Sequence, residues 1–270
     1  MTNVLLIGAG NMGFAMLRSW TGLAGHRFVV VEVNDALQKR AQDVGASSYA
    51  DLSDLPPDYR ADILVIATKP QGVADAIAAG SERLTSGGLI ISIAAGVTLD
   101  GMRQKAGENA VVIRAMPNTP AAIGEGMIVC CTSGNADVAD RRRAETLLSA
   151  IGRVVFVGDE CLMDAVTAVS GSGPAYLFYF LEAFSAAGVS AGLPPDIAML
   201  LAKQTLYGSA KMALDPMADP SALRVQVTSP NGTTAAALSV LMDADDGLAP
   251  LLRNAVEAAR LRSGELGRLA

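Results

Sequence analysis

Short apolar runs alternate with segments of helical periodicity over the first part of the chain. The runs are rich in Val and Ile and lack alternation, which is typical of strands covered on both faces. They lie at residues 4–7, 28–33, 63–67, 89–93 and 111–115, with two further runs at 126–131 and 153–157. Helical segments fall between them at residues 12–24, 36–44, 71–79, 99–105 and 136–150. Because strands and helices alternate, the pattern predicts an α/β fold with a doubly wound parallel sheet.

The pattern changes after Gly158, where helical periodicity continues and no convincing strand follows. Helices are expected at residues 164–169, 175–187, 196–214, 235–242 and 248–266. Pro174 suits the first turn of the second of these helices. The sequence therefore predicts two domains, an α/β domain over residues 1–159 and an all-helical domain over residues 160–270.

A glycine turn follows the first predicted strand and opens the first predicted helix. It reads Gly8-Ala9-Gly10-Asn11-Met12-Gly13. In a Rossmann-type fold the first glycine permits the tight turn, the second lets backbone approach a pyrophosphate, and the third lets helix and sheet pack closely. Glu32 ends the next apolar run about twenty residues on, where an acidic residue can bind a ribose hydroxyl. The turn predicts dinucleotide binding, and the alternative is a purely structural turn.

The segments that follow the strands are the next candidates, since ligands of open α/β sheets bind at the carboxyl ends of strands. These segments consist of small and turn residues, as expected where backbone meets a cofactor. The alternative for each is an ordinary strand-to-helix turn. The segments are Ala67-Thr68-Lys69-Pro70, Ala94-Ala95-Gly96-Val97-Thr98 and Met116-Pro117-Asn118-Thr119-Pro120.

The helical part contains one polar turn that is a candidate ligand-binding site, from Val227 through Ser229 to Thr233 and Thr234. Gly232 permits unusual backbone angles, and we expect the two threonines to open a helix. Free N–H groups at a helix start, together with hydroxyls, form an anion site without a charged side chain. A small carboxylate would suit this site, and the alternative is an ordinary capped helix start.

Composition narrows the possible functions. A net charge of −6 over 270 residues argues against a nucleic-acid surface. No apolar stretch reaches the ~18 residues of a membrane span and no leader is visible, so we expect a cytoplasmic, soluble protein. The three cysteines are read as buried and reduced, and His26 as a surface loop residue. No metal cluster or Ser/His/Asp set is expected, which suits hydride transfer, because the cofactor carries that chemistry.

Several motifs together resemble the pyrroline-5-carboxylate reductase family. They follow the family's order and, with the glycine turn, cover almost the whole chain. They are Ile93-Ala94-Ala95-Gly96-Val97-Thr98, Arg114-Ala115-Met116-Pro117-Asn118-Thr119-Pro120, Asp164-Ala165-Val166-Thr167, Ser170-Gly171-Ser172-Gly173-Pro174-Ala175-Tyr176 and Thr228-Ser229-Pro230 with Gly232-Thr233-Thr234.

The resemblance implies reduction of 1-pyrroline-5-carboxylate to L-proline with NADPH or NADH. It also implies a helical domain that interlocks with a second subunit, a homodimer with its active site at the interface, and often a decamer. The implied cofactor contacts are Ile7, Gly8, Ala9, Gly10, Asn11, Met12, Ala67, Thr68, Lys69, Pro70, Ala94, Ala95 and Met116.

For the substrate, the resemblance implies contacts from the segment after the fifth strand and from the polar turn. The backbone N–H groups of Thr233 and Thr234 would bind the carboxylate. The Thr234 hydroxyl would lie beside the ring nitrogen and act as the catalytic group. The substrate set is Asn118, Val227, Ser229, Gly232, Thr233 and Thr234.

The chain departs from the family at two places. Asn231 stands where glycine is usual, and Asn is the best replacement for glycine at positive φ. The end of the second strand reads Val31-Glu32-Val33-Asn34-Asp35. Family members that bind a 2′-phosphate tend to offer hydroxyl or basic groups there, whereas this chain offers carboxylates. We therefore expect both cofactors to work and NADH to have the higher kcat/KM. If the strand instead ends at Asn34, then Asn34 and Asp35 would meet the ribose.

Two other functions are compatible with a dinucleotide-binding domain. A hydroxyacid dehydrogenase of similar layout would carry a lysine in an N-x-x-K motif, and residues 171–182 contain neither Asn nor Lys. A non-catalytic nucleotide-sensing protein is opposed by the intact substrate-loop residues alone. The helical segments also look apolar on more than one face, which predicts a dimer interface. Its expected residues are Leu177, Phe180, Phe184, Leu200 and Leu201.

Overall fold

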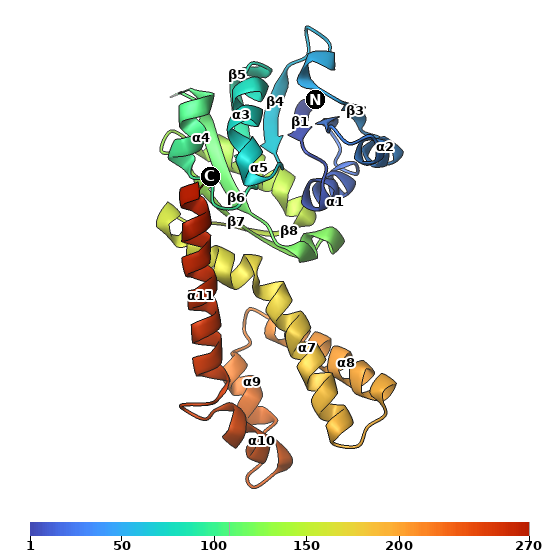
Figure 1. Ribbon diagram of the computed structural model, residues 1–270, viewed down its shortest axis with the longest axis vertical. Helices are drawn as coiled ribbons and strands as arrows, with labels where there is room; N and C mark the ends of the chain where they lie inside the picture. Colours follow the sequence, from blue (N-terminus) through green and yellow to red (C-terminus); the bar gives the residue numbers. More distant parts are fainter. Residues whose placement is uncertain (108, 270) are drawn as a thin grey trace. The chain divides into compact units, whose positions relative to one another are not determined.

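The computed structural model describes residues 1–107 and 109–269 (Figure 1). The chain forms two compact units. The first contains residues 1–172 and the stretch from Ala259 onward, and the second contains Gly173–Ala258. The proposed domain boundary between residues 159 and 160 stays a prediction.

The first unit is built on a sheet that, in the described residues, has the strand order β3-β2-β1-β4-β5-β6-β7-β8. Strands β1 to β6 pair in parallel, β7 is antiparallel to β6, and β8 is parallel to β7. The predicted doubly wound sheet is confirmed except for this reversal at β7. The strands are β1 (Thr2–Ile7), β2 (His26–Val31), β3 (Ser47–Tyr49), β4 (Ala61–Ile66), β5 (Leu84–Ser92), β6 (Val111–Met116), β7 (Gly126–Thr132) and β8 (Gly152–Phe156).

Helices cover both faces of this sheet and create two cores. One face packs against α1 (Asn11–Trp20), α2 (Asp35–Asp43) and α5 (Val138–Leu148). The other face packs against α3 (Val73–Ser81) and α4 (Leu99–Ala106). Burial on both faces explains why the central strands are continuously apolar in sequence.

Short helices complete the first unit. One of them, η6, is a π-helical turn that follows directly on α6. They are η1 (Leu52–Asp54), η2 (Pro70–Gly72), η3 (Thr119–Ile123), η4 (Ser149–Ile151), η5 (Glu160–Leu162), α6 (Met163–Val166) and η6 (Thr167–Gly171).

The second unit is helical in its described residues. It contains α7 (Gly173–Ser190), α8 (Pro195–Ala213), α9 (Pro220–Gln226), α10 (Thr233–Leu241) and the first part of α11 (Leu248–Leu269). The gap predicted between the helices at residues 164–169 and 175–187 is shorter in the structure, because η6 runs to Gly171 and α7 begins at Gly173. Helices α7 and α8 pack where Gly188 meets Ala198, since a Cβ at Gly188 would lie 3.2 Å from the Ala198 Cβ.

Apolar side chains remain exposed on α7 and α8. Leu177, Phe180, Phe184, Leu200 and Leu201 are between 39% and 62% exposed. No helix in the described residues is both long enough and apolar enough to span a membrane.

Candidate active site

The glycine turn lies where the strand order of the sheet reverses, between β1 and β4. The Ala67 N–H donates a hydrogen bond to the Ile7 carbonyl at 2.8 Å and so joins the ends of these strands. Gly8 has φ +94°, and a Cβ there would lie 2.8 Å from the Ala67 carbonyl oxygen. A Cβ at Gly13 would overlap the Gly8 carbonyl oxygen and approach the Ala67 Cβ to 3.2 Å. The first and third glycines therefore have the roles predicted for them, a tight turn and close helix–sheet packing.

The second glycine faces open space. A Cβ at Gly10 would meet no described atom within 4 Å. Gly10 is also the N-cap of α1, and no side chain caps this helix. The first N–H groups of α1 and its positive end are therefore available to an anion. The pyrophosphate of a dinucleotide fits this arrangement.

A second feature of the same site also fits a polar ligand. Thr68 follows Ala67 after β4, and its Oγ1 atom is buried without a hydrogen-bond partner in the described structure. A buried hydroxyl without a partner is unfavourable by about 1–3 kcal/mol. A bound ligand that hydrogen-bonds to the Thr68 hydroxyl would remove this penalty.

Glu32 is tied to the glycine turn. One carboxylate oxygen accepts a hydrogen bond from the Ala9 N–H at 2.7 Å, and the other accepts from the Asn34 N–H at 3.0 Å. Strand β2 ends at Val31, so Glu32 is the first residue after the strand. The acidic residue therefore lies beside the turn, as expected from its spacing in sequence.

The alternative in which Asn34 and Asp35 meet the ribose gains no support. The Asn34 side chain caps α2, accepting hydrogen bonds from the Ala36 N–H at 3.0 Å and the Leu37 N–H at 3.2 Å. The first two basic side chains after Asn34 also already have partners within the protein. Lys39 pairs with Asp43, and the Arg40 guanidinium lies 3.7 Å over the ring of Phe14.

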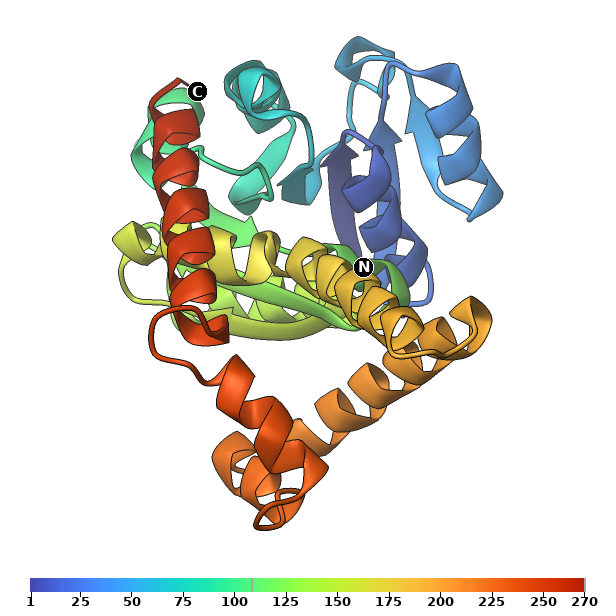
Figure 2. The same ribbon diagram turned by 60° about the horizontal axis from the view of Figure 1, so that its bottom comes forward.

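The loop after β5 contains Ala94 and Ala95 and approaches the end of α11. The Ala94 N–H donates to the Ser92 hydroxyl at 3.3 Å. Gly96 has φ +82°, and a Cβ at Gly267 would lie 2.9 Å from the Gly96 carbonyl oxygen. Close by, the Ser263 hydroxyl donates to the Asp164 carboxylate at 2.7 Å. Figures 1 and 2 both show this end of α11 (red) beside the green segment that contains α4.

The segment after β6 is packed against the π-helical turn η6. The Asn118 Nδ2 donates to the Ser170 carbonyl at 3.1 Å, and the Asn118 Oδ1 accepts from the Met127 N–H at 2.9 Å. A Cβ at Gly171 would lie 2.5 Å from the Met116 Cε. These contacts orient Asn118, and its contact with substrate stays a prediction.

In the second unit, the polar turn leads into α10 as predicted. Asn231 has φ +57° and is the one non-glycine residue at positive φ in the described chain. Gly232 does not use the unusual backbone angles that glycine permits, because its φ of −81° is ordinary. A Cβ at position 232 would overlap the Ser229 hydroxyl and lie 3.2 Å from the Ser229 carbonyl oxygen, so a larger residue there requires the exposed Ser229 side chain to rotate.

Helix α10 begins at Thr233 without a side-chain cap. The N–H groups of Thr233 and Thr234 therefore lie in its first turn, where a helix has no backbone acceptors for them. Val227 and Ser229 are exposed in the turn before it, and the Ser229 carbonyl accepts from the Gly232 N–H at 3.1 Å. This arrangement can bind a small carboxylate.

The predictions for the cysteines and for His26 each need one correction. Cys130 and Cys131 are buried as expected, but Cys161 is exposed, because it lies in the short helix η5 at the surface. His26 is not in a loop: it opens β2 and stacks on Phe28. The described residues contain no group of three or more His, Cys, Asp or Glu that could hold a metal ion.

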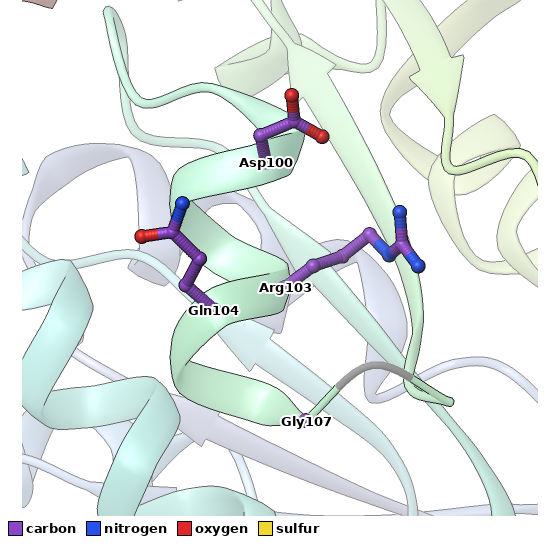
Figure 3. A pocket seen from close by; sticks show the side chains of 4 residues that line it. All are labelled: Asp100, Arg103, Gln104 and Gly107. Carbon is purple, nitrogen blue, oxygen red and sulfur yellow. The ribbon is translucent and has the colours of Figure 1, made fainter.

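One cavity in the first unit, of about 420 Å³, is unrelated to the predicted site. It is lined by Asp100, Arg103, Gln104 and Gly107. Figure 3 shows the three side chains projecting from α4 in different directions, so they do not converge on a common point. None of the residues predicted to bind cofactor or substrate lines this cavity.

An ion pair that joins β6 to η5 near the site was not predicted from the sequence. Arg114 in β6 is buried and lies 2.8 Å from the carboxylate of Glu160. A charged residue inside an otherwise apolar strand was the available signal, because a buried charge needs a partner. The sequence gives no indication of which of the many carboxylates that partner would be.

Comparison with known proteins identifies the family of this chain. Residues 160–266 match the family described as pyrroline-5-carboxylate reductase dimerisation, and residues 3–96 match NADP oxidoreductase, coenzyme F420-dependent. A pyrroline-5-carboxylate reductase of Pseudomonas aeruginosa is 37% identical, with 97% of this chain and 96% of the relative aligned.

Solved structures agree with this sequence similarity. A pyrroline-5-carboxylate reductase from Coxiella burnetii has a TM-score of 0.91 and 32% identity, and the match covers 98% of both chains. The Plasmodium falciparum enzyme, solved with NADP bound, has a TM-score of 0.82 and 26% identity, also over 98% of both chains. This chain therefore belongs to the pyrroline-5-carboxylate reductase family.

Proposed function

We propose that this protein reduces 1-pyrroline-5-carboxylate to L-proline, using NADH or NADPH. The observation that carries the proposal is the presence, in a member of this family, of two uncapped helix starts at the predicted cofactor and substrate positions. One is the uncapped start of α1 at the glycine turn, and the other is the uncapped start of α10 at Thr233. The first suits a dinucleotide pyrophosphate and the second suits the carboxylate of a small substrate.

The residues of the first unit fit a nicotinamide dinucleotide. The N–H groups at the start of α1 would hold the pyrophosphate, Glu32 would hold the adenosine ribose, and Thr68 would hydrogen-bond the ligand after β4. When bound, the reduced nicotinamide supplies a hydride, which goes to the carbon of the C=N bond. The matching family of residues 3–96 is described as an NADP oxidoreductase, and the Plasmodium relative binds NADP.

The residues of the second unit would bind and orient the imine. The backbone N–H groups of Thr233 and Thr234 would hold the carboxylate. The Thr234 hydroxyl would accept a hydrogen bond from the protonated ring nitrogen and so fix the ring for hydride attack. Since the substrate carries its proton on nitrogen, hydride addition gives a neutral amine, and this step needs no acid from the protein. Asn118, Val227, Ser229 and Gly232 complete the proposed substrate set.

The proposal includes a homodimer, with assembly to a decamer as a further possibility to test. The exposed apolar residues of α7 and α8 support self-association, and residues 160–266 match a dimerisation family. We also place the enzyme in the cytoplasm, where its free cysteines would stay reduced.

Two parallel reactions test the function. The purified protein is mixed with 1-pyrroline-5-carboxylate and NADH or NADPH, and the absorbance of the reduced nicotinamide is followed. A parallel reaction contains a small hydroxyacid with NAD⁺ or NADP⁺, which a hydroxyacid dehydrogenase would oxidise. We expect turnover in the first reaction alone. Turnover in the second alone would support the dehydrogenase alternative, and binding without turnover in either would support a nucleotide-sensing protein.

A further inference from the structure

A buried cation and a single carboxylate oxygen connect three segments of the first unit. Arg114 in β6 is 5% exposed. Its Nη1 lies 2.8 Å from Glu160 Oε1, and the Leu99 N–H donates to the same oxygen, also at 2.8 Å. Glu160 itself lies in η5. One oxygen atom therefore links β6, the start of α4 and η5.

Glu160 completes the cap of α4. Thr98 is the N-cap, and its hydroxyl accepts from the Gly101 N–H at 3.2 Å. The Leu99 N–H, at the first position of the helix, is taken by Glu160 instead. A carboxylate at this end of a helix is also favoured by the helix dipole. Glu160 and Thr98 together therefore fix the start of α4, where the loop after β5 ends.

The two donors to Glu160 belong to segments that carry predicted cofactor residues. The loop that ends at Thr98 contains Ala94 and Ala95. Arg114 lies two residues before Met116 on the same strand. Glu160 is not among the predicted cofactor contacts, and its link to them runs through the Leu99 N–H and the Arg114 side chain.

These two segments belong to the second half of the nucleotide-binding sheet. A Rossmann-type sheet consists of two mononucleotide-binding halves that meet where the strand order reverses. The glycine turn and Glu32 lie in the half formed by β1, β2 and β3. The loops after β5 and β6 lie in the other half, formed by β4, β5 and β6. With the adenosine held at Glu32, the nicotinamide half of the cofactor falls to the loops of this second half.

We propose that Glu160 is a positioning residue for the nicotinamide half of the cofactor site. It holds the loop after β5 and the end of β6 in register with each other through one shared oxygen. This inference rests on the proposed function in so far as the cofactor is a nicotinamide dinucleotide. It does not depend on the identity of the substrate.

Fragment binding tests this role, because ADP-ribose lacks the nicotinamide. The dissociation constants of NADH and ADP-ribose are measured by calorimetry for the wild type and for Glu160→Ala. We expect the Kd of NADH to rise about tenfold, or ~1.4 kcal/mol, because the loop after β5 and the end of β6 lose the acceptor that they share. The Kd of ADP-ribose should stay within about twofold. Glu160→Gln should recover most of the NADH affinity, because its amide oxygen can still accept from the Leu99 N–H.

The chain offers a matched control on α5. Asp140 also accepts a backbone N–H, from Asp137 at 3.1 Å, and pairs with an arginine, Arg143, at 2.6 Å. Asp140→Ala therefore removes the same kind of network from another part of the first unit. We expect it to lower the melting temperature without changing the Kd of either ligand.

The removal of Glu160 leaves Arg114 buried without its partner, which can prevent folding. If Glu160→Ala does not fold, the double variant Arg114→Met/Glu160→Ala is measured with the same expectation. An equal rise in both Kd values, or no rise for NADH, overturns the proposal. Failure of the wild type to bind both NADH and NADPH also overturns it, whereas binding of either cofactor without reduction of the imine overturns only the proposed substrate.

Discussion

The carboxylate of Glu32 accepts a hydrogen bond from the backbone N–H of Ala9 at 2.7 Å. This contact joins the end of β2 to the middle of the glycine turn. It also fixes a negative charge beside the uncapped start of α1, where the pyrophosphate and adenosine ribose of a dinucleotide would lie. The charge favours a ribose hydroxyl as its partner and disfavours a 2′-phosphate.

Glu32→Ser should therefore change the choice of cofactor. We expect the wild type to use both cofactors with the higher kcat/KM for NADH. The substitution removes the repulsion of a 2′-phosphate and should shift the kcat/KM ratio towards NADPH by about tenfold, or ~1.4 kcal/mol. Steady-state kinetics with both cofactors measure this shift.

Glu82→Ser is the control for the cofactor experiment. Glu82 is an exposed carboxylate that follows α3, and its loss changes the net charge by the same amount. The ratio of kcat/KM for NADPH to that for NADH should be the same in Glu82→Ser as in the wild type. A wild type that strongly prefers NADPH, with a ratio indifferent to Glu32→Ser, would show that the ribose does not bind at Glu32.

Thr234→Ala tests the proposed catalytic hydroxyl. Loss of one hydrogen bond to the protonated imine costs ~1–3 kcal/mol, so kcat/KM should fall about ten- to a hundredfold. The Kd of NADH should stay the same, because Thr234 lies in the second unit. Ser239→Ala, which removes an exposed hydroxyl later in α10, should leave both quantities unchanged. Equal kcat/KM values for Thr234→Ala and the wild type would show that the Thr234 hydroxyl has no catalytic role and that Thr234 only forms part of the helix start.

Self-association should depend on the exposed apolar face of α7 and α8. Leu200 is 62% exposed, and Leu200→Glu would place a charge among apolar neighbours if this face is covered by a second copy. Light scattering should give at least a dimer for the wild type and a smaller species for the variant. Ile123→Glu, at a 78% exposed site of the first unit, should not change the mass. A wild type that stays at 27.7 kDa at micromolar concentration would contradict the expected interface.

The backbone at Asn231 predicts opposite effects for two substitutions. Its φ of +57° suits glycine and asparagine and strains β-branched residues. Asn231→Gly should therefore retain kcat/KM within about twofold. Asn231→Val should lose about 1–2 kcal/mol of loop stability and raise the KM for substrate, because the turn leads directly into Thr233. If both variants behave alike in kinetics and thermal unfolding, the positive φ does not hold in solution.

The cysteines should differ in reactivity. Burial raises the pKa of the Cys130 thiol to about 12 and that of Cys131 to about 11, whereas Cys161 is exposed. At pH 8, a disulfide reagent should modify one thiol in the native protein and all three after unfolding. Cys161→Ser should remove the native reaction. Modification of two or three thiols before unfolding would show that the β7 core opens.

These raised pKa values also give the stability a pH dependence. An unfolded thiol ionises near 9.0, while the folded Cys131 holds its proton to about 11. The folded state then binds more protons, so the free energy of unfolding should fall as pH rises from about 9 to 11. Replacing Cys131 by alanine should make this fall shallower in urea titrations at several pH values.

The strands and helices that have a local hydrophobic pattern could be predicted from the sequence. Strands β1, β2, β4, β5 and β6 were found because both of their faces are buried and their runs are continuously apolar. Strand β3 was missed, because Ser47-Ser48-Tyr49 is short and polar and depends on its neighbour β2. The direction of β7 could not be predicted either, since an apolar run is the same in both directions.

The candidate site was predictable where a short motif determines the geometry, as at Gly8 and Gly13. The site was less predictable where its geometry depends on contacts with residues outside the motif. Asn231 has the positive φ expected of it, but the close approach of Gly232 to the Ser229 hydroxyl was not predicted. The pairing of Arg114 with Glu160 joins residues 46 positions apart and follows no periodicity.

The return of α11 to the first unit has a consequence for the order in which the protein is made. Gly96 receives its packing partner Gly267, and Asp164 receives Ser263, after the whole of Gly173–Ala258 has been synthesised. The nascent nucleotide-binding sheet therefore emerges from the ribosome early but with the loop after β5 uncovered. Its final shape at that loop has to wait for translation of the helical unit.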